Sequence, residues 1–171
     1  MAKTIIMAWS KCSFEIGTTL ENDGMATELV SVGKIKDKSS TLEPSDGDAL
    51  EMKATGGELV AKETNEGGYV AKTRVIEPSA ELLTKLGIAE VVSEEGADKG
   101  DLRVKTHIVS GNWSLKVTPK NVGARGIKAP KTSIAYKPGW SEEDGHYVDL
   151  EFDILKGDAN YWYSMFTKAQ V

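Results

Sequence analysis

One feature constrains the fold of this chain most: a strand stops at a proline and is followed by one short helix. Residues 69–76 alternate with a period of two, which is typical of a half-buried strand. Pro78 ends this strand because proline has no amide hydrogen to donate. The following segment, about 78–87, places leucines on one face and reaches Gly87, a residue type that commonly terminates helices. The stretch predicts one amphipathic helix beside a sheet.

Four further segments alternate in the same way, each with one apolar and one charged face. They are residues 50–54, 102–108, 113–118 and 148–154. This pattern is typical of antiparallel sheets with a dry side and a wet side. Turn-forming residues separate the segments: Asn22-Asp23-Gly24, Asp46-Gly47, Gly56-Gly57, residues 65–68, Ser110-Gly111-Asn112, Pro138-Gly139 and Asp144-Gly145.

These patterns predict a single mainly β domain over residues 1–171. We expect an antiparallel β-barrel or an orthogonal β-sandwich with one short flanking α-helix. Two hairpins are predicted in particular, one over Gly56-Gly57 and one over Ser110-Gly111-Asn112.

The composition excludes several classes of protein. A net charge of -5 argues against a protein whose main task is to grip nucleic acid, because that task needs a basic surface. No segment approaches the roughly 20 apolar residues of a membrane helix, so we expect no membrane partner. The single cysteine, Cys12, alternates with Phe14 and Ile16, and we expect it to be buried. Folding in a reducing cytoplasm is the expectation.

No arrangement of residues predicts catalysis. The two histidines, His107 and His146, match no zinc spacing. The acidic turns 46–48 and 142–144 lack the ligand pattern of a calcium loop. The glycines of residues 123–126 are not followed by the helix of a phosphate-binding loop, and no nucleophile elbow is present. We expect no enzymatic activity, no cofactor and no metal.

Charge is divided along the second half of the chain. Residues 120–137 contain lysine and arginine but no acidic residue, whereas residues 142–153 contain acidic residues but no lysine or arginine. The two blocks could be two solvated surfaces. Alternatively, the basic face of one subunit meets the acidic face of the next, a head-to-tail contact that builds rings or filaments. Residues 34–47 and 120–130 are predicted as long loops, where partners often bind.

The strand at 68–75, Pro78 and the segment 82–87 together resemble phage tail tube proteins, and by extension the ring-forming tube protein of type VI secretion. Residues 14–17 and 148–152 also fit this layout, so the resemblance covers most of the chain. It implies hexameric rings stacked into a hollow tube, with an acidic lumen along which DNA slides. It also implies a long loop that reaches the next ring, for which 34–47 is the candidate. Assembly would take place in the cytoplasm, and the product would join a virion tail with other tail components.

The expected partner is therefore another copy of this chain. The candidate subunit-contact residues are Lys36, Lys38, Glu43, Asp46, Glu81, Lys85, Arg125, Lys128, Lys131, Glu142, Glu143 and Asp144. The alternative is a non-catalytic β-sandwich module that binds carbohydrate or a surface partner. Trp140 and the aromatic residues 161–163 suggest that alternative, although the latter could equally belong to a last strand that closes the core.

Overall fold

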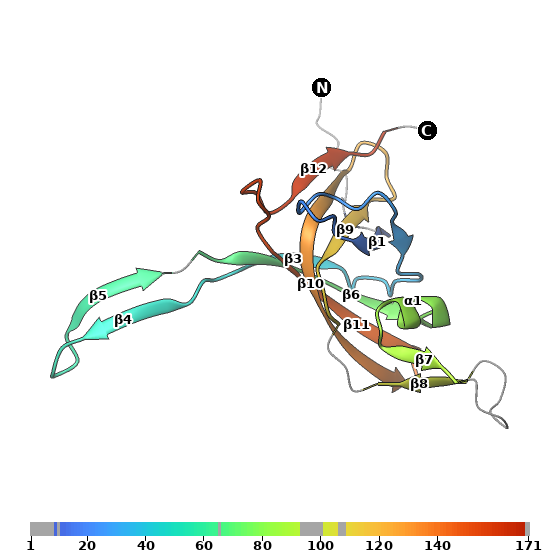
Figure 1. Cartoon of the computed structure of the whole chain (residues 1–171), viewed down its shortest axis with the longest axis horizontal. Coiled ribbons are helices and arrows are strands. Elements are labelled where there is room, and N and C mark those ends of the chain that lie inside the picture. Colours follow the sequence, from blue (N-terminus) through green and yellow to red (C-terminus); the bar gives the residue numbers. More distant parts are fainter. Residues whose placement is uncertain (1–8, 10, 65, 93–100, 106–108, 170–171) are drawn as a thin grey trace.

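The computed structural model describes residues 9, 11–64, 66–92, 101–105 and 109–169. It confirms the mainly β prediction: one large antiparallel sheet and two hairpins accompany a single short helix among the described residues (Figure 1). The large sheet contains β1 (Ser13–Thr18), β2 (Val30–Ser31), β3 (Thr41–Ser45), β6 (Gly68–Ile76), β9 (Trp113–Thr118), β10 (Arg125–Ser141), β11 (Gly145–Ile154) and β12 (Ser164–Thr167). Its order is β2-β1-β9-β10-β11-β6-β3, and β12 pairs with β10.

One segment of chain joins the two edges of this sheet. After β2, the Val32 amide donates to the Phe14 carbonyl on β1 over 3.0 Å. Three residues later, Ile35 forms a bridge with Val75 on β6, and the chain continues into β3, which also pairs with β6. Because the same segment bonds to both edges, the sheet curls into a barrel-like body.

Alternating side chains fill the interior of this body. The buried apolar residues of β1, β9 and β11 are Phe14, Ile16, Trp113, Leu115, Val117, Val148, Leu150, Phe152 and Ile154. The Phe14 and Phe152 rings lie 6.0 Å apart at the centre. Cys12 is buried and has no disulfide partner, as expected.

The helix α1 (Ala80–Lys85) lies where the sequence predicted it. The Ser79 side chain accepts a hydrogen bond from the Leu82 amide and caps the N-terminus. Gly87, with φ of 71°, follows the last turn. Leu82, Leu83 and Leu86 are almost completely buried, so the leucine face closes one side of the barrel.

Both predicted long loops are wrong, because each contains a strand. Within 34–47, β3 pairs with β6 although it reads as polar and contains Pro44. An edge strand tolerates proline, since one row of its backbone groups faces no neighbour. Within 120–130, β10 already begins at Arg125 and continues through the predicted turn at Pro138-Gly139. The register of β10 against β9 shifts between Ala129 and Thr132, and this bulge accommodates Pro130.

The two predicted hairpins have opposite outcomes. The one over Gly56-Gly57 is confirmed: it joins β4 (Ala49–Lys53) to β5 (Leu59–Thr64), and both glycines have positive φ. The one over Ser110-Gly111-Asn112 is wrong. There, β8 (Leu102–Val104) pairs with β7 (Ala89–Val91), whereas β9 pairs with β1 and β10. His107 lies outside the described residues.

Candidate functional site

The β4–β5 hairpin extends away from the barrel (Figure 1). We call residues 46–67 the arm, since they lie beyond the last pair between β3 and β6, Ser45 with Gly68. Every side chain from residue 49 to residue 63 is exposed. The sequence predicted a dry side for 50–54, and this prediction is wrong because no part of the barrel covers the arm.

The arm nevertheless has two chemically different faces. Residues directly opposite each other in an antiparallel pair share a face, and successive residues alternate between faces. Because Met52 pairs with Ala61, they lie on one face together with Leu50. Leu50 is 62% and Met52 64% exposed. The arm therefore presents an apolar face to solvent.

The opposite face of the arm is ionic. Glu51 pairs with Lys62 in the register, and its carboxylate lies 3.3 Å from the ammonium groups of both Lys62 and Lys53. At the base, the Gly68 amide donates to the Ser45 hydroxyl over 3.1 Å, which fixes where the arm leaves the barrel. The charged face thus finds ion-pair partners on the arm itself, whereas no described part of the chain packs on the apolar face.

Exposed charges of opposite sign lie at the two ends of β10, which spans the length of the barrel (Figure 1). Arg125 is exposed at its start, and the half-buried Lys128 ammonium lies 5.2 Å from the centre of the Phe166 ring. Glu142 and Glu143 are exposed in the turn after its end. Arg125 and the turn residues Glu142 and Glu143 are therefore far apart along the strand. The rest of the two charged blocks lies side by side where β10 pairs with β11, with Lys137 opposite Asp149.

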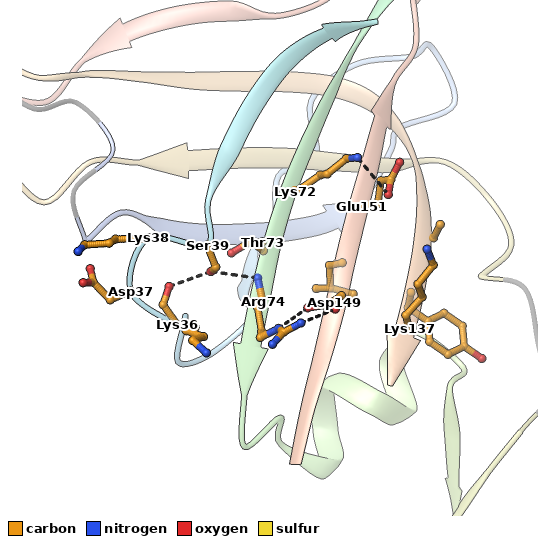
Figure 2. Close-up of a pocket in the computed structure, with 13 residues that line it drawn as sticks. Lys36, Asp37, Lys38, Ser39, Lys72, Thr73, Arg74, Lys137, Asp149 and Glu151 are labelled. Atoms are coloured by element: carbon orange, nitrogen blue, oxygen red, sulfur yellow. Dashed lines mark hydrogen bonds and ion pairs between the residues drawn. The ribbon is translucent and has the colours of Figure 1, made fainter. Parts of the chain in front are cut away.

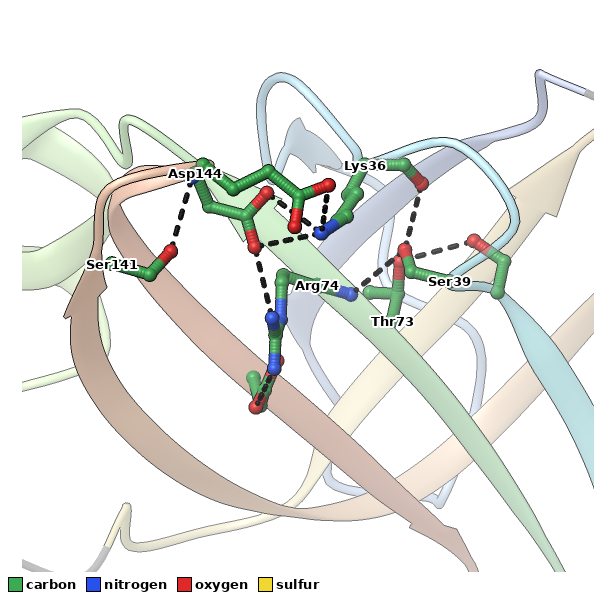
Figure 3. Close-up of polar contacts among 9 residues, drawn as sticks. Lys36, Ser39, Thr73, Arg74, Ser141 and Asp144 are labelled. Carbon is green, nitrogen blue, oxygen red and sulfur yellow. Dashed lines mark hydrogen bonds and ion pairs between the residues drawn. The ribbon is translucent and has the colours of Figure 1, made fainter.

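Asp144, in that same acidic turn, lies in an internal network (Figure 3). Its carboxylate accepts hydrogen bonds from Lys36 Nζ at 2.8 Å and Arg74 Nη1 at 2.9 Å, and only 6% of its side chain is exposed. Arg74 also binds Asp149 through two nitrogens, over 2.6 and 2.9 Å. The network fastens the segment that joins the sheet edges to the β10–β11 turn.

These contacts shift pKa values in the directions that ion pairs require. The hydrogen bond from Lys36, with a smaller contribution from Arg74, lowers the pKa of Asp144, although partial desolvation opposes the shift. The same bond raises the pKa of Lys36. Asp149, followed by Asp144, raises the pKa of Arg74. The Asp144 carboxylate is thus held ionised, as a structural ion pair requires.

A cavity of about 410 Å³ lies over the polar face of β6, β10 and β11 (Figure 2). Opposite charges pair across its floor, Arg74 with Asp149 and Lys72 with Glu151. Its lining is polar and mostly charged, with Lys36, Asp37 and Lys38 on one side.

The predicted contact residues separate into two groups. Lys36, Glu143 and Asp144 share ion pairs with one another, and Lys131 binds Asp23 over 2.9 Å. The remaining residues are exposed on the barrel, helix or arm, apart from the half-buried Lys128: Lys38, Glu43, Asp46, Glu81, Lys85, Arg125 and Glu142. The second group, together with the exposed Glu143, is available to a partner.

The aromatic residues of the alternative interpretation lie in different places. Trp140, 77% exposed near the β10–β11 turn, stacks on His146 with ring centres 4.4 Å apart. Tyr161 is exposed, but Trp162 and Tyr163 pack edge-on against Tyr69. Residues 161–163 precede β12 and do not form a flat platform.

No protein-family model matches the chain, and no curated protein is similar to it in sequence. In the part of the chain that the structure describes, no three His, Cys, Asp or Glu residues gather as metal ligands. None of its helices combines the length and apolarity that a membrane crossing requires. The sequence patterns missed the exposed apolar face of the arm, although the alternation of Leu50 and Met52 was its signal.

Proposed function

We propose that this chain is a structural subunit of a phage-tail-tube-like assembly, in which copies self-associate into rings that stack into a hollow tube. The observation that carries the proposal is the arm, whose apolar face is covered by none of the residues that the structure describes. An isolated two-stranded hairpin is marginally stable in water. A neighbouring subunit would supply the missing cover.

We propose a heterologous contact, in which the arm of one copy binds the barrel of the next. The arm and the barrel are different surfaces, so each such contact leaves one arm and one barrel surface unused, unless two copies exchange arms about a two-fold axis. Such contacts propagate into rings or filaments. The opposite exposed charges at the two ends of β10 also suit a head-to-tail contact. The number of six subunits per ring is proposed from the resemblance to tail tube proteins alone.

An acidic tube would also suit the passage of DNA. The net charge of -5 denies a nucleic acid the phosphate contacts on which tight binding depends. We therefore propose that DNA is a passenger of the assembly and not a tightly bound partner.

The test compares the full chain with two arm variants. Leu50→Ser combined with Met52→Ser removes the apolar face, whereas Lys53→Ser alters the ionic face and serves as the matched control. We expect sedimentation velocity and negative-stain electron microscopy to show rings or tubes for the wild type and the control, and monomers for the double variant. A wild type that stays monomeric up to its solubility limit would overturn the proposal.

A second candidate function rests on Trp140. A flat, 77% exposed indole stacked on His146 resembles the aromatic platforms on which sugar rings lie. A non-catalytic carbohydrate-binding module would then be the better description. It predicts glycan-dependent quenching of tryptophan fluorescence that Trp140→Ala abolishes, together with a monomer at every concentration.

A further inference from the structure

A second apolar surface lies on the barrel itself, between β3 and β12. It is a groove of about 520 Å³, and its lining includes Trp9, Leu42, Ile127, Tyr163, Met165 and Arg125. Ile127 and Met165 are register partners, so both side chains lie on the face of β10 and β12 that forms the groove. Met165 is 61% exposed. The groove is open to solvent and apolar at its base.

We propose that this groove is the receptor for the arm of a second copy of the chain. The inference rests on the proposed function and adds to it the site at which the arm binds. In Figure 1 the arm extends away from its own barrel. Every side chain from residue 49 to residue 63 is exposed, and none of these residues lines the groove of the same chain. The occupant is therefore the arm of another molecule.

The chemistry of the two surfaces is complementary. The arm offers a strip of Leu50, Met52 and Ala61, and the groove offers an apolar base with a thioether at its opening. Burial of such side chains is the main source of association energy. Methionine adapts its shape to the neighbour it meets, which favours Met165 as the contact at the centre.

The charge on one wall of the groove complements the arm. The arm carries six acidic residues and two lysines. Arg125 lines the β10 wall and has no ion-pair partner in the part of the chain that the structure describes, and residues 119–131 contain no acidic residue. Glu43 lines the β3 wall, so we expect the acidic arm to lie toward β10 and β12. The other exposed apolar patch, Val91 and Val104, lies on β7 and β8 beside the ion pair of Glu90 with Lys105.

One charge pair follows from the register. Glu63 lies opposite Leu50, on the apolar face of the arm. Its carboxylate borders the strip that enters the groove, as Arg125 borders the groove. We assign Glu63 of one copy and Arg125 of the next as the pair that sets the direction of docking.

The first test uses substitutions on the groove in the full chain. Met165→Glu and Arg125→Glu are each expected to raise the protein concentration needed for half-assembly at least tenfold. Combining Arg125→Glu with Glu63→Arg should recover a substantial part of that loss. Val104→Glu, a charge placed on an equally exposed valine at the other end, is the control and should leave assembly unchanged.

The second test uses oxidation of paired cysteines. A mixture of the single variants L50C and M165C should give a disulfide-linked dimer, whereas the double variant should give a ladder of longer oligomers. The wild type, whose Cys12 is buried, is the blank. Dimers from either single variant alone, or no ladder from the double variant, would overturn the inference.

The outcomes distinguish the two proposals. If the wild type never self-associates, the proposed function fails. A second outcome is that the wild type assembles and the Leu50 and Met52 double variant does not, while Met165→Glu and Arg125→Glu assemble normally. The arm would then be a contact whose receptor lies elsewhere. That result would overturn the groove inference and leave the proposed function standing.

Discussion

Truncation of Leu82 tests whether the helix is a structural plug of the barrel. This side chain is 2% exposed and lies on the apolar face of α1. The helix has only six residues, too few to be stable on its own in water. Its leucines must therefore hold it in place, and Leu82→Ala should destabilise the whole domain.

The expected loss follows from the atoms removed. Leu→Ala deletes three carbon atoms, which at about 0.8 kcal/mol each gives a transfer contribution of about 2.4 kcal/mol. The cavity left among Leu83, Leu86 and the rest of the core adds to this figure. The free energy of unfolding should fall by about 3–4 kcal/mol, within the range of buried Leu→Ala substitutions. For a chain of this length the midpoint of thermal unfolding should fall by about 10 °C.

The assay is urea unfolding followed by circular dichroism, at a concentration low enough to keep the protein monomeric. Leu50→Ala is the matched control, since it is the same change on a leucine that is 62% exposed. In the monomer it should alter the free energy of unfolding by no more than about 0.5 kcal/mol. Equal losses for the two variants would refute the reasoning, because the arm would then pack on its own barrel.

Three further predictions concern two carboxylates and a buried hydroxyl. Asp144→Asn should destabilise the protein at neutral pH, because the pKa of Asp144 is lowered in the folded state. The stability that this carboxylate contributes is present above its ordinary pKa of 3.8 and is lost as pH falls through the lowered pKa. Asp153→Asn should instead stabilise the protein at neutral pH, because desolvation raises the pKa of Asp153 and its ionised form costs stability; thermal melts from acidic to neutral pH check both signs. Ser114→Ala should cost about 1–3 kcal/mol in urea unfolding, because the buried hydroxyl accepts from the Ala26 amide and donates to a carbonyl; a loss below that range would mean that water replaces the hydroxyl.

Local signals predicted the helix and the interior strands correctly. Pro78, the spacing of the leucines and Gly87 each act on residues a few positions away, so the sequence alone shows their effect. The alternation in β11 places Val148 and Phe152 in the core as predicted. These features depend on residues a few positions apart.

Signals that depend on distant partners were misread. The turn at residues 110–112 is real as a bend, but β9 is a central strand whose partners, β1 and β10, lie elsewhere in the sequence. The Pro138-Gly139 pair lies in the stretch of β10 that follows Thr132. Among the described residues this stretch pairs only with β11, so its other side is an edge, and an edge strand tolerates proline.

The candidate site was predictable in part. The separation of charge could be read from the sequence, and so could the hairpin that became the arm. The ion pairs Lys36–Asp144 and Lys131–Asp23 could not, since each joins residues 108 positions apart. The absence of a cover for Leu50 is a property of the whole fold, and no local pattern contains it.

The length of β10 has a mechanical consequence. Its 17 residues run from the basic end of the barrel to the acidic end, and ten of them pair with β11. A pull between the two ends therefore acts along the ladder and loads those ten pairs together, in shear. Rupture under such a load requires many hydrogen bonds to break at once, whereas a pull across the strands would open them one after another. The subunit is built to be stiff along β10 and weak across it.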